Sequence, residues 1–512
     1  MRIDAAFLAL ALPFSALAFS ALAQEPMSVI DWLSRDRPAD LSGRVLLEPP
    51  VTVNARQAAI AVTPLAMQAT LVGLVPGSAT GLPADMWGAS DANTVARLIA
   101  QVPVLDTPAM QTLLYTVLLS ETRPPAGKMA AETMLLARID RLLDLGATDP
   151  AQALVQHAGA EATQARFARW FDATLLTGDE DRSCATLIAT PHLAPDYAAR
   201  IFCGARGGNW ATAALLLEAA HALDLLPPNT LALLDRFLSP EMFEGAPYLP
   251  TPPNPDPLSF RIFEAIGERF PTASLPRAFA TADLRDVAGW KAQLEAAERL
   301  ARIGALSPNR LLGIYSERLP AASGGIWDRV AALQRFETAL DSGSADAVAK
   351  TLPIVWAAMQ DVQLEVPFAV LFSERLAAQD LDNPATTALA YKIRLLSPSY
   401  ELAAQNPPLY AKNARFLAAL AQGEPGRVPA PTPIAQAITD GFANGATLPT
   451  DLQRGLTDGQ LGWVILKAIG LFDSGAKGDL TDLTEALVAF RSVGLEDTAR
   501  RAALQLMLLE RS

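Results

Sequence analysis

Residues 196–226, "DYAARIFCGARGGNWATAALLLEAAHALDLL", contain the pattern from which a helical architecture can be predicted. Alanine and leucine, the strongest helix formers, fill both halves of this stretch. The triplet Gly207-Gly208-Asn209 separates the two halves, and residues of this kind favour a tight turn over a helix. The stretch therefore predicts a hairpin, in which a helix from Asp196 to Arg206 is followed by an antiparallel helix over residues 210–226.

Similar segments occupy most of the remaining chain. Apolar residues recur at helical spacing in consecutive segments that glycine, proline or aspartate separates. Asp91 precedes the first of these segments and is a candidate N-cap. Short β-branched runs, broken by proline and glycine, indicate strands or extended arms at residues 44–75. We therefore expect a mainly α fold, an antiparallel helical-hairpin array similar to an α-solenoid, with a small N-terminal β or extended segment.

The first residues of the chain have the organisation of a secretory signal peptide. Arg2 precedes an apolar run over residues 5–22, and Ala21-Leu22-Ala23 supplies the small residues that a signal peptidase reads. A membrane anchor is the alternative, but the run is only marginally long enough and contains Pro13. No later stretch reaches the ~18 uninterrupted apolar residues of a membrane-spanning helix. We predict cleavage after residue 23 and export to the periplasm, with no integral membrane segment left after cleavage.

Two proline-rich stretches interrupt the helical segments. "GAPYLPTPPNPDP" (residues 245–257) and "GEPGRVPAPTP" (residues 423–433) cannot continue a helix, and we interpret both as module boundaries. The predicted organisation is a signal peptide (1–23), an N-terminal helix and β or extended segment (24–90), helical module I (91–245), a proline-rich linker (246–257), helical module II (258–422), a second linker (423–433) and a C-terminal helical module (434–512).

The chain contains two cysteines, Cys184 and Cys203, and export predicts that they form a disulfide, because secretory compartments are oxidising. A redox motif would need a spacing of three residues, whereas these cysteines are nineteen apart. A zinc site would need further ligands, and the three histidines, at 157, 192 and 221, are widely scattered. Two unpaired buried thiols remain the alternative. We place Cys203 near the end of its helix and Cys184 at the end of the preceding helix or in the following loop.

Three short motifs could carry chemistry, and each lacks what that chemistry needs. Glu317, in "SERL", is not followed by the Gly-Leu-Met-Gln-type segment of soluble lytic transglycosylases, so we expect a solvated helix residue. "SGAK" (474–477) matches S-x-x-K, but no later Ser-x-Asn or Lys-Thr-Gly follows, so we expect a turn. "TGDEDRS" (177–183) indicates a solvated acidic turn, with a weak calcium site as the alternative. The sequence thus predicts no catalytic residue, no cofactor or cofactor-binding residue and no metal ligand.

Several predicted hairpins share the spacing pattern "A..L..G....A...L". In each, a small turn such as "RGGNWA", "DSGSADA" or "SGAKGDL" joins two helices rich in alanine and leucine. Over residues 184–245, 325–360 and 460–512 the chain resembles tetratricopeptide and Sel1-like α-solenoids of exported bacterial proteins. The resemblance implies stacked helical hairpins. It assigns no binding residues, because a period of 34 residues is not sustained.

Composition narrows the possible functions. A net charge of −13 repels nucleic acid and anionic lipid headgroups, so neither is an expected partner. We expect a non-enzymatic periplasmic scaffold or adaptor whose concave helical surface binds an envelope or periplasmic protein. The alternative is a glycan-cleaving cell-wall enzyme carried on a helical superhelix, whose site would place two scattered carboxyl groups at roughly 5–9.5 Å across a cleft.

Overall fold

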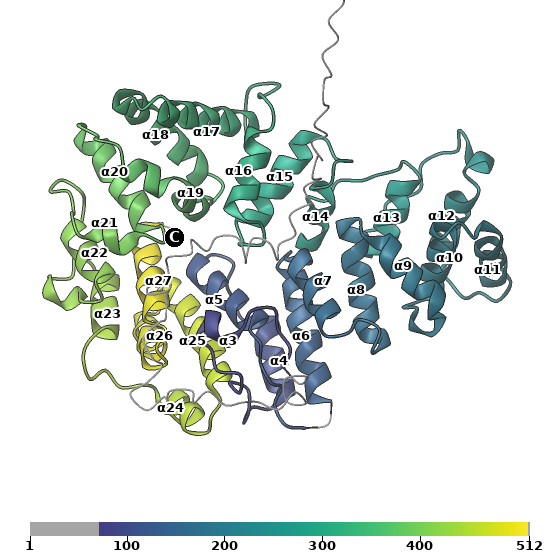
Figure 1. Ribbon diagram of the computed structural model, residues 1–512, viewed down its shortest axis with the longest axis horizontal. Coiled ribbons are helices and arrows are strands. Elements are labelled where there is room, and N and C mark those ends of the chain that lie inside the picture. Colours follow the sequence, from purple (N-terminus) through teal and green to yellow (C-terminus); the bar gives the residue numbers. More distant parts are fainter. Residues whose placement is uncertain (1–70, 128, 510–512) are drawn as a thin grey trace, which may run out of the picture. The chain divides into compact units, whose positions relative to one another are not determined.

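Helices make up most of the computed structural model, which describes residues 71–127 and 129–509 (Figure 1). These residues belong to one compact unit, Leu46–Ser512. The predicted signal peptide, the predicted N-terminal helix and the predicted extended arms before residue 71 lie outside the described residues. All three predicted helical modules lie within the compact unit, and their boundaries stay predictions.

The first helices, up to the first proline-rich stretch, are α3 (Gly77–Thr80), α4 (Ala92–Gln101), α5 (Pro108–Leu119), α6 (Ala130–Asp144), α7 (Thr148–His157), α8 (Gln164–Thr177), α9 (Glu180–Ala189), η1 (Pro191–Leu193), α10 (Tyr197–Arg206), α11 (Trp210–Ala222), α12 (Pro228–Leu238) and η2 (Pro240–Phe243). Those between the two proline-rich stretches are α13 (Pro257–Ala265), η3 (Arg277–Phe279), α14 (Ala280–Asp283), α15 (Trp290–Ala301), α16 (Pro308–Ser316), α17 (Ile326–Asp341), α18 (Ala345–Gln360), α19 (Glu365–Ala377), α20 (Pro384–Leu395), α21 (Tyr400–Ala404) and α22 (Ala414–Ala421). The last are η4 (Pro425–Arg427), α23 (Pro433–Gly441), α24 (Thr450–Thr457), α25 (Leu461–Ala476), α26 (Leu480–Ser492) and α27 (Glu496–Leu508). The prediction of a mainly α fold from Asp91 onward is confirmed over the described residues.

The described end of the predicted extended segment forms bridges and no strand. Val72 pairs with Thr122 and Val75 pairs with Ser120, each as an isolated bridge. One bridge is antiparallel and the other is parallel, so the two cannot belong to one ladder. In the described residues, β structure is therefore limited to these contacts.

The hairpin at residues 196–226 forms as expected, with a shorter second helix. Asp196 caps α10 by accepting a hydrogen bond from the Ala199 N–H, and Asn209 caps α11 in the same way. The helix predicted to reach residue 226 ends at Ala222, because Asp224 adopts a left-handed backbone conformation with φ of 47°. The N–H of Leu225 then bonds back to the carbonyl of Ala220.

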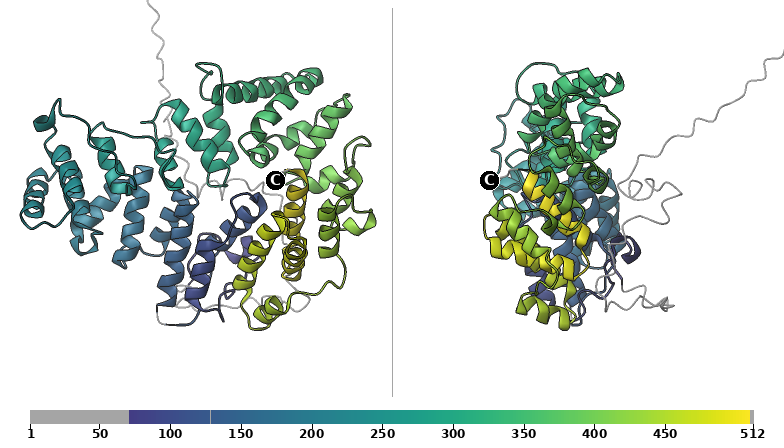
Figure 2. Two further views of the ribbon diagram at one scale, coloured as in Figure 1. Left: turned by 180° about the vertical axis from the view of Figure 1, so that it is seen from behind. Right: turned by 90° about the vertical axis from the view of Figure 1, so that its left-hand side faces the viewer.

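Neighbouring helices pack as hairpins, and the last helices also contact the first. The pairs α10 with α11, α17 with α18 and α25 with α26 are antiparallel neighbours along the chain. In addition, α25 packs against α4 and α5, and α27 packs against α5 (Figures 1 and 2). The N–H of Gly462 bonds to the carbonyl of Met86 at 2.9 Å, and the ring of Trp87 lies against Gly462. An open solenoid leaves its two ends apart, whereas here they share a core.

No helix among the described residues has both the length and the apolar character needed to cross a membrane.

Candidate functional site

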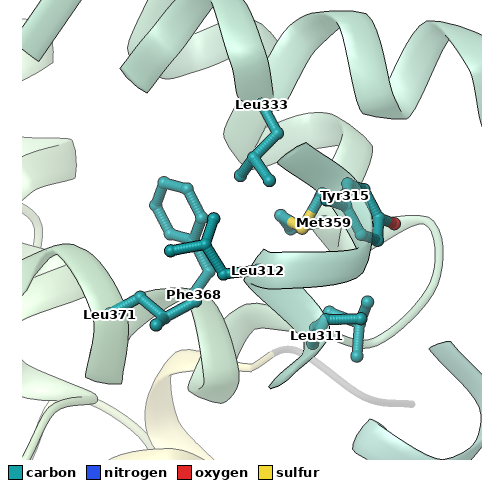
Figure 3. A pocket seen from close by; sticks show the side chains of 8 residues that line it. Leu311, Leu312, Tyr315, Leu333, Met359, Phe368 and Leu371 are labelled. Atoms are coloured by element: carbon teal, nitrogen blue, oxygen red, sulfur yellow. The ribbon is translucent and has the colours of Figure 1, made fainter. Parts of the chain in front are cut away.

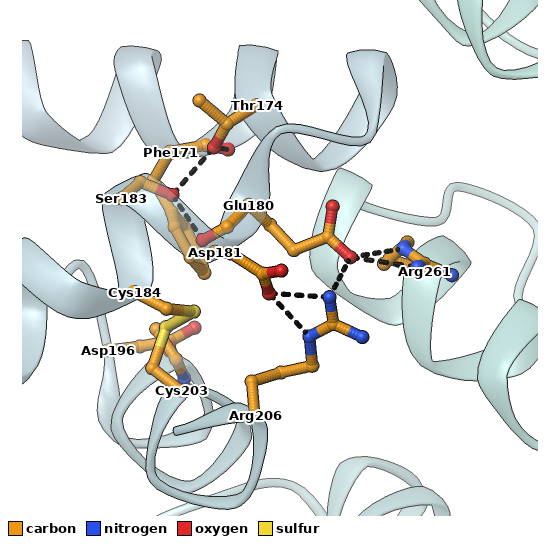
Figure 4. The surroundings of a disulfide bond; sticks show 11 residues. Phe171, Thr174, Glu180, Asp181, Ser183, Cys184, Asp196, Cys203, Arg206 and Arg261 are labelled. Atoms are coloured by element: carbon orange, nitrogen blue, oxygen red, sulfur yellow. Dashed lines mark hydrogen bonds and ion pairs between the residues drawn. A yellow bond between two sulfur atoms is a disulfide. The ribbon is translucent and has the colours of Figure 1, made fainter. Parts of the chain in front are cut away.

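The two cysteines join consecutive helices in the interior of the protein (Figure 4). Cys184 in α9 and Cys203 in α10 form a disulfide, with their Cα atoms 4.8 Å apart. Both residues are buried. Cys203 lies near the end of its helix as predicted, but the predicted position of Cys184 is wrong, because Cys184 lies in the middle of α9. The sulfur atoms face packed side chains, so this pair is a structural link.

A buried ion-pair cluster lies beside the disulfide. Glu180, the first residue of α9, has no exposed surface, and its carboxylate contacts the guanidinium groups of Arg206 at 3.3 Å and Arg261 at 2.8 Å (Figure 4). Arg206 also binds Asp181, which is largely exposed. The prediction of a solvated acidic turn at residues 177–183 is therefore wrong for Glu180. Two guanidinium groups offset the desolvation of its carboxylate, and a single acidic side chain could not be buried without them.

The cluster continues from Arg261 into α13 and α14. Arg261 also contacts Glu264, which in turn binds Arg285 and, at 3.2 Å, Arg269. Arg269 binds Asp283, the last residue of α14. Each arginine and each carboxylate of this chain of ion pairs faces a group of opposite charge, so we interpret the cluster as a structural connection between α9, α13 and α14.

A second group of carboxylates consists of Asp172 in α8 and the N-cap residues of α10 and α13, Asp196 and Asp256. Burial, reinforced by the negative charges of Asp256 and Asp196, raises the pKa of Asp172 to about 7. Burial likewise raises the pKa of Asp196. Asp196 and Asp256 are themselves N-caps, and each accepts a 2.7 Å hydrogen bond from a backbone N–H of its helix. Two members of this carboxylate cluster therefore have structural roles, and Asp172 alone is left without one.

The two sequence motifs that were compared with catalytic templates do not form sites. Glu317 is the C-cap of α16 and pairs with Arg318 at 2.9 Å. Ser474 belongs to the last turn of α25, so the predicted turn starts later than expected. Lys477, the C-cap, places its ammonium group 2.6 Å from the carboxylate of Asp473. The S-x-x-K lysine is thus held by a carboxylate one turn before it and not by the serine.

No group of three or more histidine, cysteine, aspartate or glutamate side chains is arranged to hold a metal ion within residues 71–127 and 129–509. His157 and His192 are exposed, while His221 pairs with Asp235 at 2.9 Å.

Four helices enclose a small apolar gap. Leu311 and Tyr315 of α16, Leu333 of α17, Met359 of α18 and Phe368 of α19 surround about 10 Å³ (Figure 3). A water molecule needs a volume of about that size and polar partners as well. The hydroxyl of Tyr315 already donates a hydrogen bond to the carboxylate of Glu298 in the core. The gap is therefore a packing defect too small for a ligand.

A larger groove lies on the surface beside α22. It encloses about 370 Å³ between the link that precedes α22, the helix N-terminus and the segment that follows η4. We call it the proline-lined groove, because four prolines line it together with Phe416 and Val428. Its lining residues are Pro407, Pro408, Leu409, Ala411, Asn413, Ala414, Arg415, Phe416, Val428, Pro429 and Pro431.

Large apolar side chains project from one rim of this groove. Leu409 is 84% exposed and Tyr410 is 80% exposed. Lys412 and Arg415, both exposed, follow directly, and neither side chain has a partner among the described residues. From sequence, residues 423–433 are predicted only to be a linker. The Pro407-Pro408 pair is the sequence signal that could have identified the other wall of the groove, which faces residues 428–431.

Comparison with protein families, with curated proteins and with solved structures finds no match to this chain.

Proposed function

We propose that this protein is a non-enzymatic periplasmic adaptor that binds another envelope protein through the proline-lined groove and its rim. The supporting observation is the exposure of Leu409 and Tyr410 beside a groove of about 370 Å³. Scattered exposed apolar residues are ordinary on protein surfaces, but apolar side chains gathered at a concave surface are typical of interaction sites.

The helical array suits this role. Hairpins that pack in series hold a surface groove on rigid elements, so binding does not require the array to reorganise. The groove itself is built on the buried base of α22, where Ala414 and Phe416 pack into the core. A partner would therefore meet a preformed surface.

In-cell crosslinking tests this proposal. The double substitution Leu409→Asp with Tyr410→Ser removes the apolar rim, and we expect it to abolish the crosslink to an exported partner identified by mass spectrometry. The matched control is Leu319→Asp with Tyr248→Ser, because these residues are of the same types and are 82% and 84% exposed away from the groove. Equal crosslinking by the two variants would contradict the proposal.

The alternative function is a glycan-cleaving cell-wall enzyme, for which Asp172 is the candidate general acid. Burial raises the pKa of Asp172 to about 7, the range that a general acid needs near neutral pH, while its neighbours Asp196 and Asp256 are held as N-caps. Release of soluble fragments from purified cell wall measures this activity. Wild-type activity that Asp172→Asn abolishes would support the alternative, whereas inert wild-type protein would exclude it for that substrate.

A further inference from the structure

We propose that the proline-lined groove recognises an extended segment of the partner protein in which an acidic side chain stands next to a bulky apolar one. This inference rests on the proposed adaptor function and specifies the chemistry of its partner.

The apolar half of the recognition comes from the groove lining. Pro407, Pro408, Pro429 and Pro431 lack backbone N–H groups, so the walls can donate few of the hydrogen bonds that would hold an added strand. Recognition therefore depends on side chains inserted between the walls. The volume of about 370 Å³ lies at the lower end of the roughly 300–1,000 Å³ typical of ligand pockets, which suits one bulky side chain and its neighbours.

Two cations at and beside the groove would attract the acidic side chain of the bound segment. Arg415 lines the groove and Lys412 precedes it by three residues, and neither side chain has an ion-pair partner in the described part of the chain. Arginines elsewhere are commonly paired, as Arg491 and Arg500 are with Glu496. Two unpaired cations at one groove, on a chain with a net charge of −13, form a local positive site on a negative surface.

The end of α22 adds to this positive potential. Asn413, the N-cap of α22, lines the groove, and its side chain makes no capping hydrogen bond. The first N–H groups of a helix have no partner within the helix and carry the positive end of its dipole. A carboxylate of the bound segment would thus meet the guanidinium group of Arg415 and the positive end of the α22 dipole, with Lys412 on the turn that precedes the helix. A basic segment would be repelled by the same groups.

Fluorescence anisotropy with synthetic peptides tests the proposal on the full-length exported chain. The probe is a fluorescein-labelled peptide in which aspartate alternates with leucine and phenylalanine. One control replaces each aspartate with asparagine, and a second replaces each leucine and phenylalanine with serine. We expect the probe to bind at least about tenfold more tightly than either control at low salt, and expect this difference to shrink near ~0.5 M salt because the charges lie at the surface.

Charge-reversal variants locate the binding. Lys412→Glu with Arg415→Glu should weaken probe binding at least about tenfold, since two attractive charges become repulsive. Lys350→Glu with Arg335→Glu makes the same change in net charge on α18 and α17, at exposed residues, and should leave binding unchanged. Thermal melts of both variants should match that of the wild type, which separates lost binding from lost folding.

Three results would overturn the proposal: equal binding of the aspartate and asparagine peptides, equal effects of the two charge reversals, or no probe binding at ~1 mM. These results leave the adaptor function standing if the Leu409 and Tyr410 variant still loses its crosslinked partner. If that crosslink also survives, the adaptor function through this groove fails with it.

Discussion

The side-chain carbonyl oxygen of Gln505 accepts a 2.8 Å hydrogen bond from the backbone N–H of Ala109, which stands 396 positions earlier in the chain. Ala109 lies in the first turn of α5, where backbone N–H groups have no partner within the helix. Both residues are buried. A side chain of α27 therefore completes the hydrogen bonding of one of the first helices, and the two ends of the array depend on each other.

Gly462 tests this dependence through packing. A Cβ atom at Gly462 would lie 2.2 Å from the ring of Trp87, so we expect Gly462→Ala to lower the free energy of unfolding by about 1–3 kcal/mol through overpacking. Gly470 is the control, because it lies in the same helix and a Cβ there would meet no atom within 4 Å. Gly470→Ala should be neutral or stabilising by up to ~1 kcal/mol, as expected for alanine in a helix. Urea denaturation measures both, and similar effects would contradict the close contact.

Glu180 and Asp181 provide a second comparison between adjacent residues. Glu180→Ala removes the carboxylate that Arg206 and Arg261 share, while Arg206 keeps Asp181 and Arg261 keeps Glu264, so we expect a loss of about 1–3 kcal/mol in unfolding free energy. The side chain of Asp181 is 78% exposed, so Asp181→Ala should cost less than about 1 kcal/mol. Equal losses in chemical denaturation would show that the burial of Glu180 has no energetic consequence.

The disulfide should stabilise the fold without contributing to binding. Reduction, or Cys203→Ser, should lower the free energy of unfolding by roughly 3 kcal/mol in the chain-entropy description and leave probe binding at the groove unchanged. Thiol labelling of protein denatured without reductant should find no reactive thiol. Two labelled thiols per chain would rule the bond out.

Asp172 should make stability depend on pH. Its pKa is about 7 in the folded protein and near 3.8 in the unfolded chain, so between these values the folded state holds a proton that the unfolded state has lost. Stability should therefore fall as pH rises from about 4 to about 7, by no more than about 4 kcal/mol. Denaturation at pH 5 and pH 8 measures the difference, which Asp172→Asn should reduce. The exposed Asp346 serves as the control, and Asp346→Asn should leave the difference unchanged.

Local features of this fold are predictable from sequence, and distant ones are not. Asp91 caps α4 and Asn209 caps α11 because each side chain acts on a backbone group three residues away. The burial of Glu180 depends on Arg261, 81 residues later, and no local pattern indicates that partner. The proline-lined groove likewise needs residues 407–416 and 428–431 to face each other. Proline composition marks the two segments as irregular, but only tertiary packing brings them together.

Because the first and last helices contact each other, folding can be completed only after the last helices have been synthesised. Ala109 is synthesised 396 residues before Gln505, which at about 5–20 residues per second is a delay of roughly 20–80 s. Until α25 and α27 are made, Trp87 and the α5 surface that they cover face water, and exposed apolar surface of this kind promotes aggregation. A chain that stops before Leu461 keeps that surface open permanently, so premature termination yields a product that chaperones and proteases can distinguish from the complete protein.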